Sequence, residues 1–247
     1  MKDQYILSRF EDIINNVLKF KRVKYTDFLS LAEQKIFEKV ILKCKQQDIS
    51  YILDGGYPLA ERKIAIVYHD FLVPEDIPIS ALRIEEDFSQ LSHRDVLGSL
   101  LGLGIKRQKI GDIIVKEHKC DILLHKDVEN YVLTNLFKVG KREVEVNSIS
   151  LKDVMAPEIK YKDVFSTVAS LRVDSITAAG FGISRTKASE LIKSVVAQIN
   201  WEYVENPSAE IKEGDIISLR GFGRIKLEEI RGKTKKGRIS VHILRYL

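Results

Sequence analysis

The sequence predicts an α+β protein of several domains. Its 247 residues, of which 45% are hydrophobic and 30% charged, can bury a sizeable core but exceed the commonest size of a single domain. Apolar residues follow a helical period in the first quarter and then alternate as they do in strands. Glycine and proline interrupt these patterns near residues 56 and 156, which predicts three domains, 1–56, 57–156 and 157–247.

The first domain, 1–56, is predicted to be helical. Ile13, Ile14, Val17 and Leu18 form an apolar stripe at helical spacing. The segment 30–33, Ser-Leu-Ala-Glu, has the pattern of a capping box, in which a serine and a glutamate three residues later bond each other's backbone amides. The helix that begins there should run to about residue 45, before glycines and a proline at 55–58 end the pattern.

The second domain, 57–156, is predicted to be a sheet with helices on one face. We expect strands at 64–68, 81–84, 112–115, 121–124 and 143–146, and helices at 93–103 and 127–137. This order resembles the RNA-recognition-motif fold, an α/β sandwich. The aromatic-rich strand that stacks bases in that fold is absent, so we do not expect this sheet to bind single-stranded RNA.

The third domain, 157–247, is predicted to be a small α+β module. Ser184 is a natural N-cap for a short helix whose apolar stripe includes Ala188 and Ile192. A strand should follow the polar turn at 210–215. Segments 224–227 and 238–243 alternate polar and apolar residues, so we expect them to pair as a hairpin with 231–237 at its tip.

The excess of positive charge lies at the C-terminal end. Residues 1–180 contain 27 basic and 27 acidic side chains, whereas residues 181–247 contain 13 basic and 8 acidic ones, which accounts for the whole net charge of +5. A local excess of this kind is typical of a polyanion-binding surface.

Two pairs of cations are the strongest candidates for phosphate contacts. Arg185 and Lys187 fall in the first turn of a predicted helix, where the helix dipole disfavours a cation unless an anion sits beside it. Arg220 and Arg224 flank a glycine-containing loop that a ligand could approach closely. The hairpin would extend this surface, with Lys226, Lys233, Lys235, Lys236 and Arg238. Alternatively, lysines on a hairpin edge only prevent aggregation.

A second contact with RNA is a weaker expectation. Lys106, Arg107 and Lys109 are clustered in the middle of the chain. An ordinary solvated loop explains them equally well.

The third domain resembles the alpha-L RNA-binding motif, also called the S-four domain. The match comprises Ser170–Asp174, Gly180, Ser184–Arg185, Ala188, Leu191–Ile192 and Gly214–Ile217. Val195–Ala197 departs from the family, which usually has glycine and valine before its strand. The resemblance implies that Arg172, Ser184, Arg185 and Lys187 contact RNA.

Nearly the whole chain resembles the YlmH family, through residues 54–63, 93–107 and 220–224. The resemblance implies a cytoplasmic bacterial factor that binds ribosomal RNA and tRNA on the large ribosomal subunit. It also implies a role in ribosome-associated quality control of stalled subunits that carry peptidyl-tRNA. We further expect a monomer, no membrane association and no small-molecule substrate.

The rival readings are an RNA-modifying enzyme that docks its substrate through the S-four domain, a ribosome assembly factor and a constitutive ribosomal protein. Gly102 and Gly104 lack the third glycine of a dinucleotide-binding fingerprint. His93-Arg94-Asp95 imitates a kinase catalytic loop, but Leu100 replaces the required asparagine. The acidic run 85–87 is typical of a solvated face. We therefore expect no enzyme and no cofactor.

Neither the cysteines nor the histidines predict a cross-link or a metal site. Cys44 and Cys120 lack a nearby cysteine partner, so we expect two buried, inert thiols. The five histidines show no helical pairing of the kind that holds zinc. No apolar run approaches the roughly 20 residues of a membrane-spanning helix.

Overall fold

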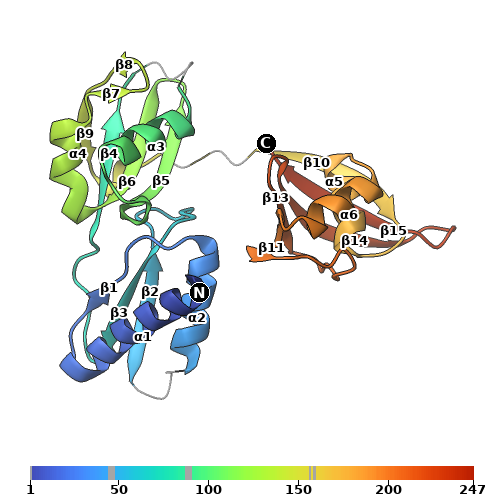
Figure 1. Cartoon of the computed structure of the whole chain (residues 1–247), viewed down its shortest axis with the longest axis horizontal. Coiled ribbons are helices and arrows are strands. Elements are labelled where there is room, and N and C mark those ends of the chain that lie inside the picture. The colour runs from blue at the N-terminus through green and yellow to red at the C-terminus, as the bar shows by residue number, and fades with distance from the viewer. Residues whose placement is uncertain (1, 44–47, 87–90, 156, 158–159) are drawn as a thin grey trace. The chain divides into compact units, whose positions relative to one another are not determined.

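The chain divides into two compact units, Met1–Pro157 and Glu158–Leu247, which we call unit 1 and unit 2. The computed structural model describes residues 2–43, 48–86, 91–155, 157 and 160–247. Both units combine helices with antiparallel sheets (Figure 1). The predicted α+β, multidomain architecture is confirmed.

The N-terminal part of unit 1 packs two helices against a small sheet. Its elements are α1 (Lys2–Phe20), β1 (Lys24–Tyr25), α2 (Leu31–Lys43), β2 (Ile49–Asp54) and β3 (Ile64–His69), with the strands in the order β1-β3-β2. Phe10, Ile14 and Phe37 are buried between helices and sheet. The predicted capping box is present: the Ser30 amide donates to the Glu33 carboxylate at 2.7 Å, and the Glu33 amide donates to the Ser30 hydroxyl at 3.3 Å.

This part of the fold differs from the predicted helical domain 1–56. It contains a sheet, and β3, expected in the second domain, pairs with β2 in this one. The pairing runs from Ile49 opposite His69 to Asp54 opposite Ile64. The segment 55–58 is therefore within the connection between two strands of one sheet. Glycine and proline mark turns inside a domain as well as between domains, so composition alone does not separate the two cases.

The second part of unit 1 is a four-stranded sheet in the order β5-β6-β4-β9. Its elements are β4 (Ile79–Ile84), α3 (His93–Gly102), β5 (Ile110–Lys116), β6 (Lys119–His125), α4 (Glu129–Asn135), β7 (Lys138–Val139), β8 (Arg142–Glu143) and β9 (Val146–Ile149). Instead of the single strand expected at 143–146, two strands occur, β8 and β9. α3 and α4 pack on the face that carries Leu82 and Ile122.

The other face of this sheet is also covered. Ala81 and Leu123 pack with Phe28 and Ile64 from the N-terminal part of the unit. At Gly111, a Cβ atom would lie only 2.7 Å from the Phe28 ring. Both faces of this sheet are therefore covered by other parts of unit 1.

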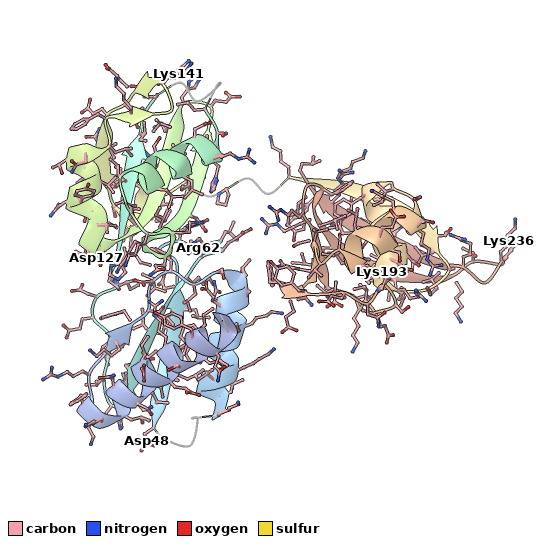
Figure 2. All side chains as sticks on the ribbon, viewed as in Figure 1. Asp48, Arg62, Asp127, Lys141, Lys193 and Lys236 are labelled. Atoms are coloured by element: carbon pink, nitrogen blue, oxygen red, sulfur yellow. The ribbon has the colours of Figure 1, made fainter. Side chains whose placement is uncertain are left out.

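The segment 54–63, one of the three segments that resemble the YlmH family, joins these two parts of unit 1. The Asp112 carboxylate accepts hydrogen bonds from the Tyr57 hydroxyl at 2.8 Å and from the Glu61 and Arg62 amides at 2.7 and 3.1 Å. The Arg62 guanidinium, labelled in Figure 2, donates to the carbonyl groups of Phe28 and Ile110, both at 2.9 Å. These residues therefore hold the fold together.

Unit 2 is a six-stranded antiparallel sheet in the order β10-β15-β14-β13-β11-β12, with two helices. Its elements are β10 (Tyr161–Val168), α5 (Val173–Phe181), α6 (Arg185–Lys193), β11 (Ala197–Ile199), β12 (Glu202–Tyr203), β13 (Ile216–Leu219), β14 (Gly223–Lys233) and β15 (Ile239–Tyr246). The predicted hairpin is confirmed as β14 and β15, which are longer than expected. β10 was not predicted and pairs with β15 over its whole length.

One of the two cysteines lies in the described part of the chain. Cys120 is buried, and burial raises the pKa of its thiol to about 12, with a further contribution from Asp121. Cys44 lies outside the described residues. Within the described part of the chain, every helix is too short or too polar to cross a membrane.

We predict that Gly180→Ala destabilises unit 2 by about 1 kcal/mol. In α5, a Cβ at this position would lie 2.6 Å from the Ile225 side chain and 3.2 Å from Ile243. Overpacking costs about 1 to 3 kcal/mol, and the better helix propensity of alanine offsets about 1 kcal/mol of this. Urea unfolding monitored by the fluorescence of Trp201, the single tryptophan, measures the loss. Gly182→Ala is not a suitable control, because Gly182 has φ 69° and alanine would be strained there. Ser194→Ala, at an exposed position, is the control.

Candidate nucleic-acid interface

The first turn of α6 presents two exposed cations. Ser184 caps the helix, and its hydroxyl accepts a hydrogen bond from the Lys187 amide at 3.1 Å. The side chains of Arg185 and Lys187 are 49% and 56% exposed. Ala188 and Ile192 are buried against the core of unit 2, which fixes the helix and directs its first turn outwards.

A buried carboxylate, which is not among the predicted site residues, connects this turn to α5. Asp174, with its side chain only 5% exposed, accepts two hydrogen bonds from each of two arginines. Arg172 donates at 3.3 and 3.0 Å, and Arg185 donates at 3.1 and 3.4 Å. Bidentate pairs of this kind fix the plane as well as the position of a guanidinium group.

The ionisation of Asp174 follows from these contacts. Burial alone would raise the pKa of its carboxyl, but the hydrogen bonds from Arg172 and Arg185 outweigh this effect and lower the pKa below its ordinary value. The carboxylate is therefore charged at neutral pH. It neutralises only one of the two guanidinium groups, so the cluster of Arg172, Asp174 and Arg185 keeps a net positive charge.

The other predicted contacts lie on a different part of unit 2. Arg220 is exposed at the end of β13, beside Gly221 and Gly223, which have φ of 85° and 97°. Arg224 lies in β14 with its guanidinium carbon 5.6 Å from the centre of the Tyr246 ring. The Lys226 ammonium is 2.7 Å from the Glu228 carboxylate.

The tip of the β14–β15 hairpin carries the remaining predicted cations. Exposed side chains there are Lys233, Lys235, Lys236 and Arg238. A turn closes the tip, with the Thr234 amide donating to the Arg238 carbonyl at 2.7 Å. The Arg238 guanidinium bonds the Thr167 hydroxyl at 3.0 Å, which ties the base of the tip to β10. Figure 2 labels Lys236 at the end of the hairpin and Lys193 on α6.

The second expected contact, in unit 1, is largely engaged in internal interactions. Lys109 lies 2.8 Å from Asp27 and 2.6 Å from Asp127. Arg107 donates to the Ile110 carbonyl at 2.7 Å. Lys106 is the exposed member of the three. This segment therefore offers RNA less positive charge than the sequence indicates.

The short motifs that imitate catalytic or cofactor-binding sequences lie at the ends of α3 and in a surface ion pair. Asp95 accepts hydrogen bonds from the Ser92 amide at 2.8 Å and from the Ser92 hydroxyl at 2.7 Å, which caps α3. Gly104, with φ 83°, follows the end of the same helix. Glu85 pairs with Lys119 at 3.0 Å, and residue 87 lies outside the described part. No three histidine, cysteine or carboxylate side chains gather to hold a metal ion among the residues that could be searched.

The fold and this surface define a class of multidomain α+β proteins with a basic C-terminal unit suited to a polyanion. Residues 74–153 match the family model described as "Putative RNA-binding domain in YlmH". A protein of Bacillus subtilis (strain 168), named "Ribosome-associated protein quality control protein P2", is 38% identical over 234 residues, which cover 90% of each chain. The chain belongs to the YlmH family.

A solved structure shows a similar fold. It is named "Cell division protein ylmH from Streptococcus pneumoniae" and superimposes with a TM-score of 0.56. The match covers 63% of this chain and 96% of that one, at 22% identity.

Proposed function

We propose that unit 2 is an RNA-binding domain of the S-four type. Through it, the protein associates with ribosomal RNA and tRNA on the large ribosomal subunit. There it takes part in the quality control of stalled peptidyl-tRNA complexes. It acts as a cytoplasmic monomer without catalytic activity. The name of the Bacillus subtilis relative supports the ribosomal role.

The observation that carries the proposal is the arrangement of arginines around Asp174. Each guanidinium has five N–H donors in a rigid fork. Arg172 and Arg185 each use two on the carboxylate within the described contacts, so donors remain for phosphate oxygens. The capped N-terminus of α6 adds backbone amides and Lys187 adds a further charge. This is a preorganised site for an RNA backbone.

The match of residues 74–153 to a family model described as a putative RNA-binding domain supports a contact with RNA in unit 1 as well. Because both faces of the four-stranded sheet are covered by protein, we propose that this part contributes only surface contacts, with Lys106 among them. Unit 2 then supplies the main affinity.

Sedimentation with purified ribosomal subunits tests the proposal. We expect the full chain to travel with the large subunit at low salt and to be released at high salt, because phosphate contacts displace counterions. A chain that ends at Pro157, the boundary between the units, should remain in the supernatant. Equal sedimentation of both chains would assign ribosome binding to unit 1. If neither chain sedimented with a subunit, the proposed association with the ribosome would be wrong.

We also predict that replacing Lys233, Lys235 and Lys236 with serine weakens binding to every RNA to a similar extent. Contacts with phosphates carry little sequence information, and each one lost lowers the slope of log affinity against log salt by about 0.7 to 0.9. A matched control replaces Lys19, Lys24 and Lys43, exposed residues of unit 1. Filter binding at several salt concentrations should show a smaller slope of log affinity against log salt only in the hairpin variant. Equal slopes in the two variants would show that the hairpin does not contact phosphates.

A further inference from the structure

The six-stranded sheet of unit 2 has one face packed by helices and one open face. α5 packs against Ile225 and Ile243: a Cβ atom at Gly180 of this helix would contact both side chains. Successive side chains of a strand point to opposite faces. The residues that flank these isoleucines along β14 and β15 therefore project from the face opposite α5.

Aromatic and cationic side chains gather on this open face. The strand register sets Tyr161 opposite Tyr246 and Phe165 opposite His242. Arg224 and Arg231 lie over two of these rings. We call the set of Tyr161, Phe165, Arg224, Arg231, His242 and Tyr246 the aromatic face.

The rings form two pairs, and one ring of each pair is exposed. The Phe165 and His242 rings are nearly parallel, at 20°, with centres 4.5 Å apart. The Tyr161 and Tyr246 rings meet edge to face at 4.9 Å. Phe165 is 59% exposed and Tyr161 is 41% exposed. Large aromatic groups that stay exposed in this way are typical of a binding surface.

Cations adjoin each pair of rings. The guanidinium carbon of Arg231 is 4.6 Å from the centre of the Phe165 ring, and that of Arg224 is 5.6 Å from the Tyr246 ring. The Phe165 pair also lies close to the basic hairpin, since Arg238 bonds the Thr167 side chain two residues along β10. Between residues 231 and 247 the chain contains six basic residues and no carboxylate side chain.

We infer that the aromatic face stacks the unpaired bases of single-stranded RNA. Unpaired bases bind proteins by stacking on aromatic rings and guanidinium planes, while nearby cations follow the phosphates. Tyr161 and Phe165 are four residues apart on one strand, about 13 Å at roughly 3.3 Å per residue, so the two pairs receive different bases. Two carboxylates also lie here, Glu229 at 2.8 Å from Arg231 and Asp163 at 2.7 Å from His242. The six basic residues between positions 231 and 247 outnumber them, which favours RNA over a protein partner at this face.

This inference goes beyond the proposed phosphate site. That site is formed by α5 and α6, and the aromatic face is on the opposite side of the sheet. The first recognises a folded RNA backbone, whereas the second requires bases that are free to stack. The two sites can therefore be separated by the choice of RNA.

The test uses the full chain, a labelled unstructured oligouridine and a labelled base-paired RNA hairpin. We expect Tyr161→Ala combined with Phe165→Ala to weaken oligouridine binding at least about thirtyfold, since two stacked bases are lost and each contributes about 1 to 3 kcal/mol. Affinity for the base-paired RNA should change less than twofold. A control, Tyr5→Ala with Phe71→Ala, removes two exposed aromatic side chains of unit 1 and should leave both affinities unchanged.

A second variant gives a direct signal of stacking. Phe165→Trp retains a ring, so it should keep the affinity for oligouridine, and its fluorescence should be quenched on binding by more than that of the wild-type chain, which has Trp201 alone. The inference is overturned if the wild type does not bind oligouridine, if the double variant binds it normally, or if both RNAs lose affinity equally. The variant Arg185→Ala with Lys187→Ala tests the phosphate site separately: it should lose affinity for the base-paired RNA, and that loss says nothing about the aromatic face.

Discussion

Arg185→Ala combined with Lys187→Ala should weaken binding to folded RNA by roughly tenfold to a hundredfold at moderate salt. Both side chains are about half exposed at the N-terminus of α6, where an anion also benefits from the helix dipole. The loss of two phosphate contacts should lower the slope of log affinity against log salt by about 1.5. Fluorescence anisotropy over a salt series measures both quantities.

A matched control replaces Lys193 and Lys212, two exposed lysines of the same unit, and should change the slope much less. Arg185→Lys keeps the charge but loses the planar fork. We expect it to retain the salt slope with lower affinity. If the double variant and the control behave alike, α6 does not contact phosphates.

Replacing Asp174 with alanine should lower the free energy of unfolding of unit 2 by about 2 kcal/mol. The carboxylate is buried and bonds two guanidinium groups, and hydrogen bonds to charged groups contribute about 1.5 to 3 kcal/mol. Removal also leaves two arginines close together without their common partner. Because both arginines remain partly hydrated, the effect should fall below that of a fully buried pair.

Urea unfolding monitored by Trp201 fluorescence measures this loss within unit 2. The control is Asp163→Ala, an exposed carboxylate that pairs with His242 at 2.7 Å, and it should cost less than 1 kcal/mol. Equal losses in the two variants would contradict a special role of Asp174.

The stability of unit 2 should also depend on pH through Asp174. The pKa of its carboxyl is lower in the folded protein than in the unfolded chain, so its contribution is fully present above about pH 4 and is lost as pH falls through the lower, folded value. The wild type should therefore lose stability below about pH 4 more steeply than Asp174→Asn. Parallel curves in urea titrations at pH 5 and pH 3 would contradict this assignment.

Local patterns predicted local structure well. The Ser30–Glu33 capping box, the N-cap at Ser184 and the pairing of β14 with β15 were all predicted and are confirmed. Each depends on residues a few positions apart or on strands joined by a short turn. Such interactions are encoded by neighbouring residues, and tertiary packing alters them little.

Long-range pairing was predicted less well. The glycines at 55 and 56 predict a domain boundary, but they lie between β2 and β3 of one sheet. β10, which the sequence does not predict, pairs with β15 about 80 residues later. An edge strand such as β10 has only a weak apolar alternation. Its place depends on an available partner strand, which the local sequence does not specify.

The distribution of charge, the short-range helix and hairpin signals and the family resemblance can all be read from the sequence. How the cations are used depends on the fold. It brought Asp174 against Arg172 and Arg185 and paired Lys109 with two carboxylates. The physical reason is that an ion pair or a ring stack depends on distances of a few ångströms between distant residues, and the fold, rather than sequence spacing, sets those distances.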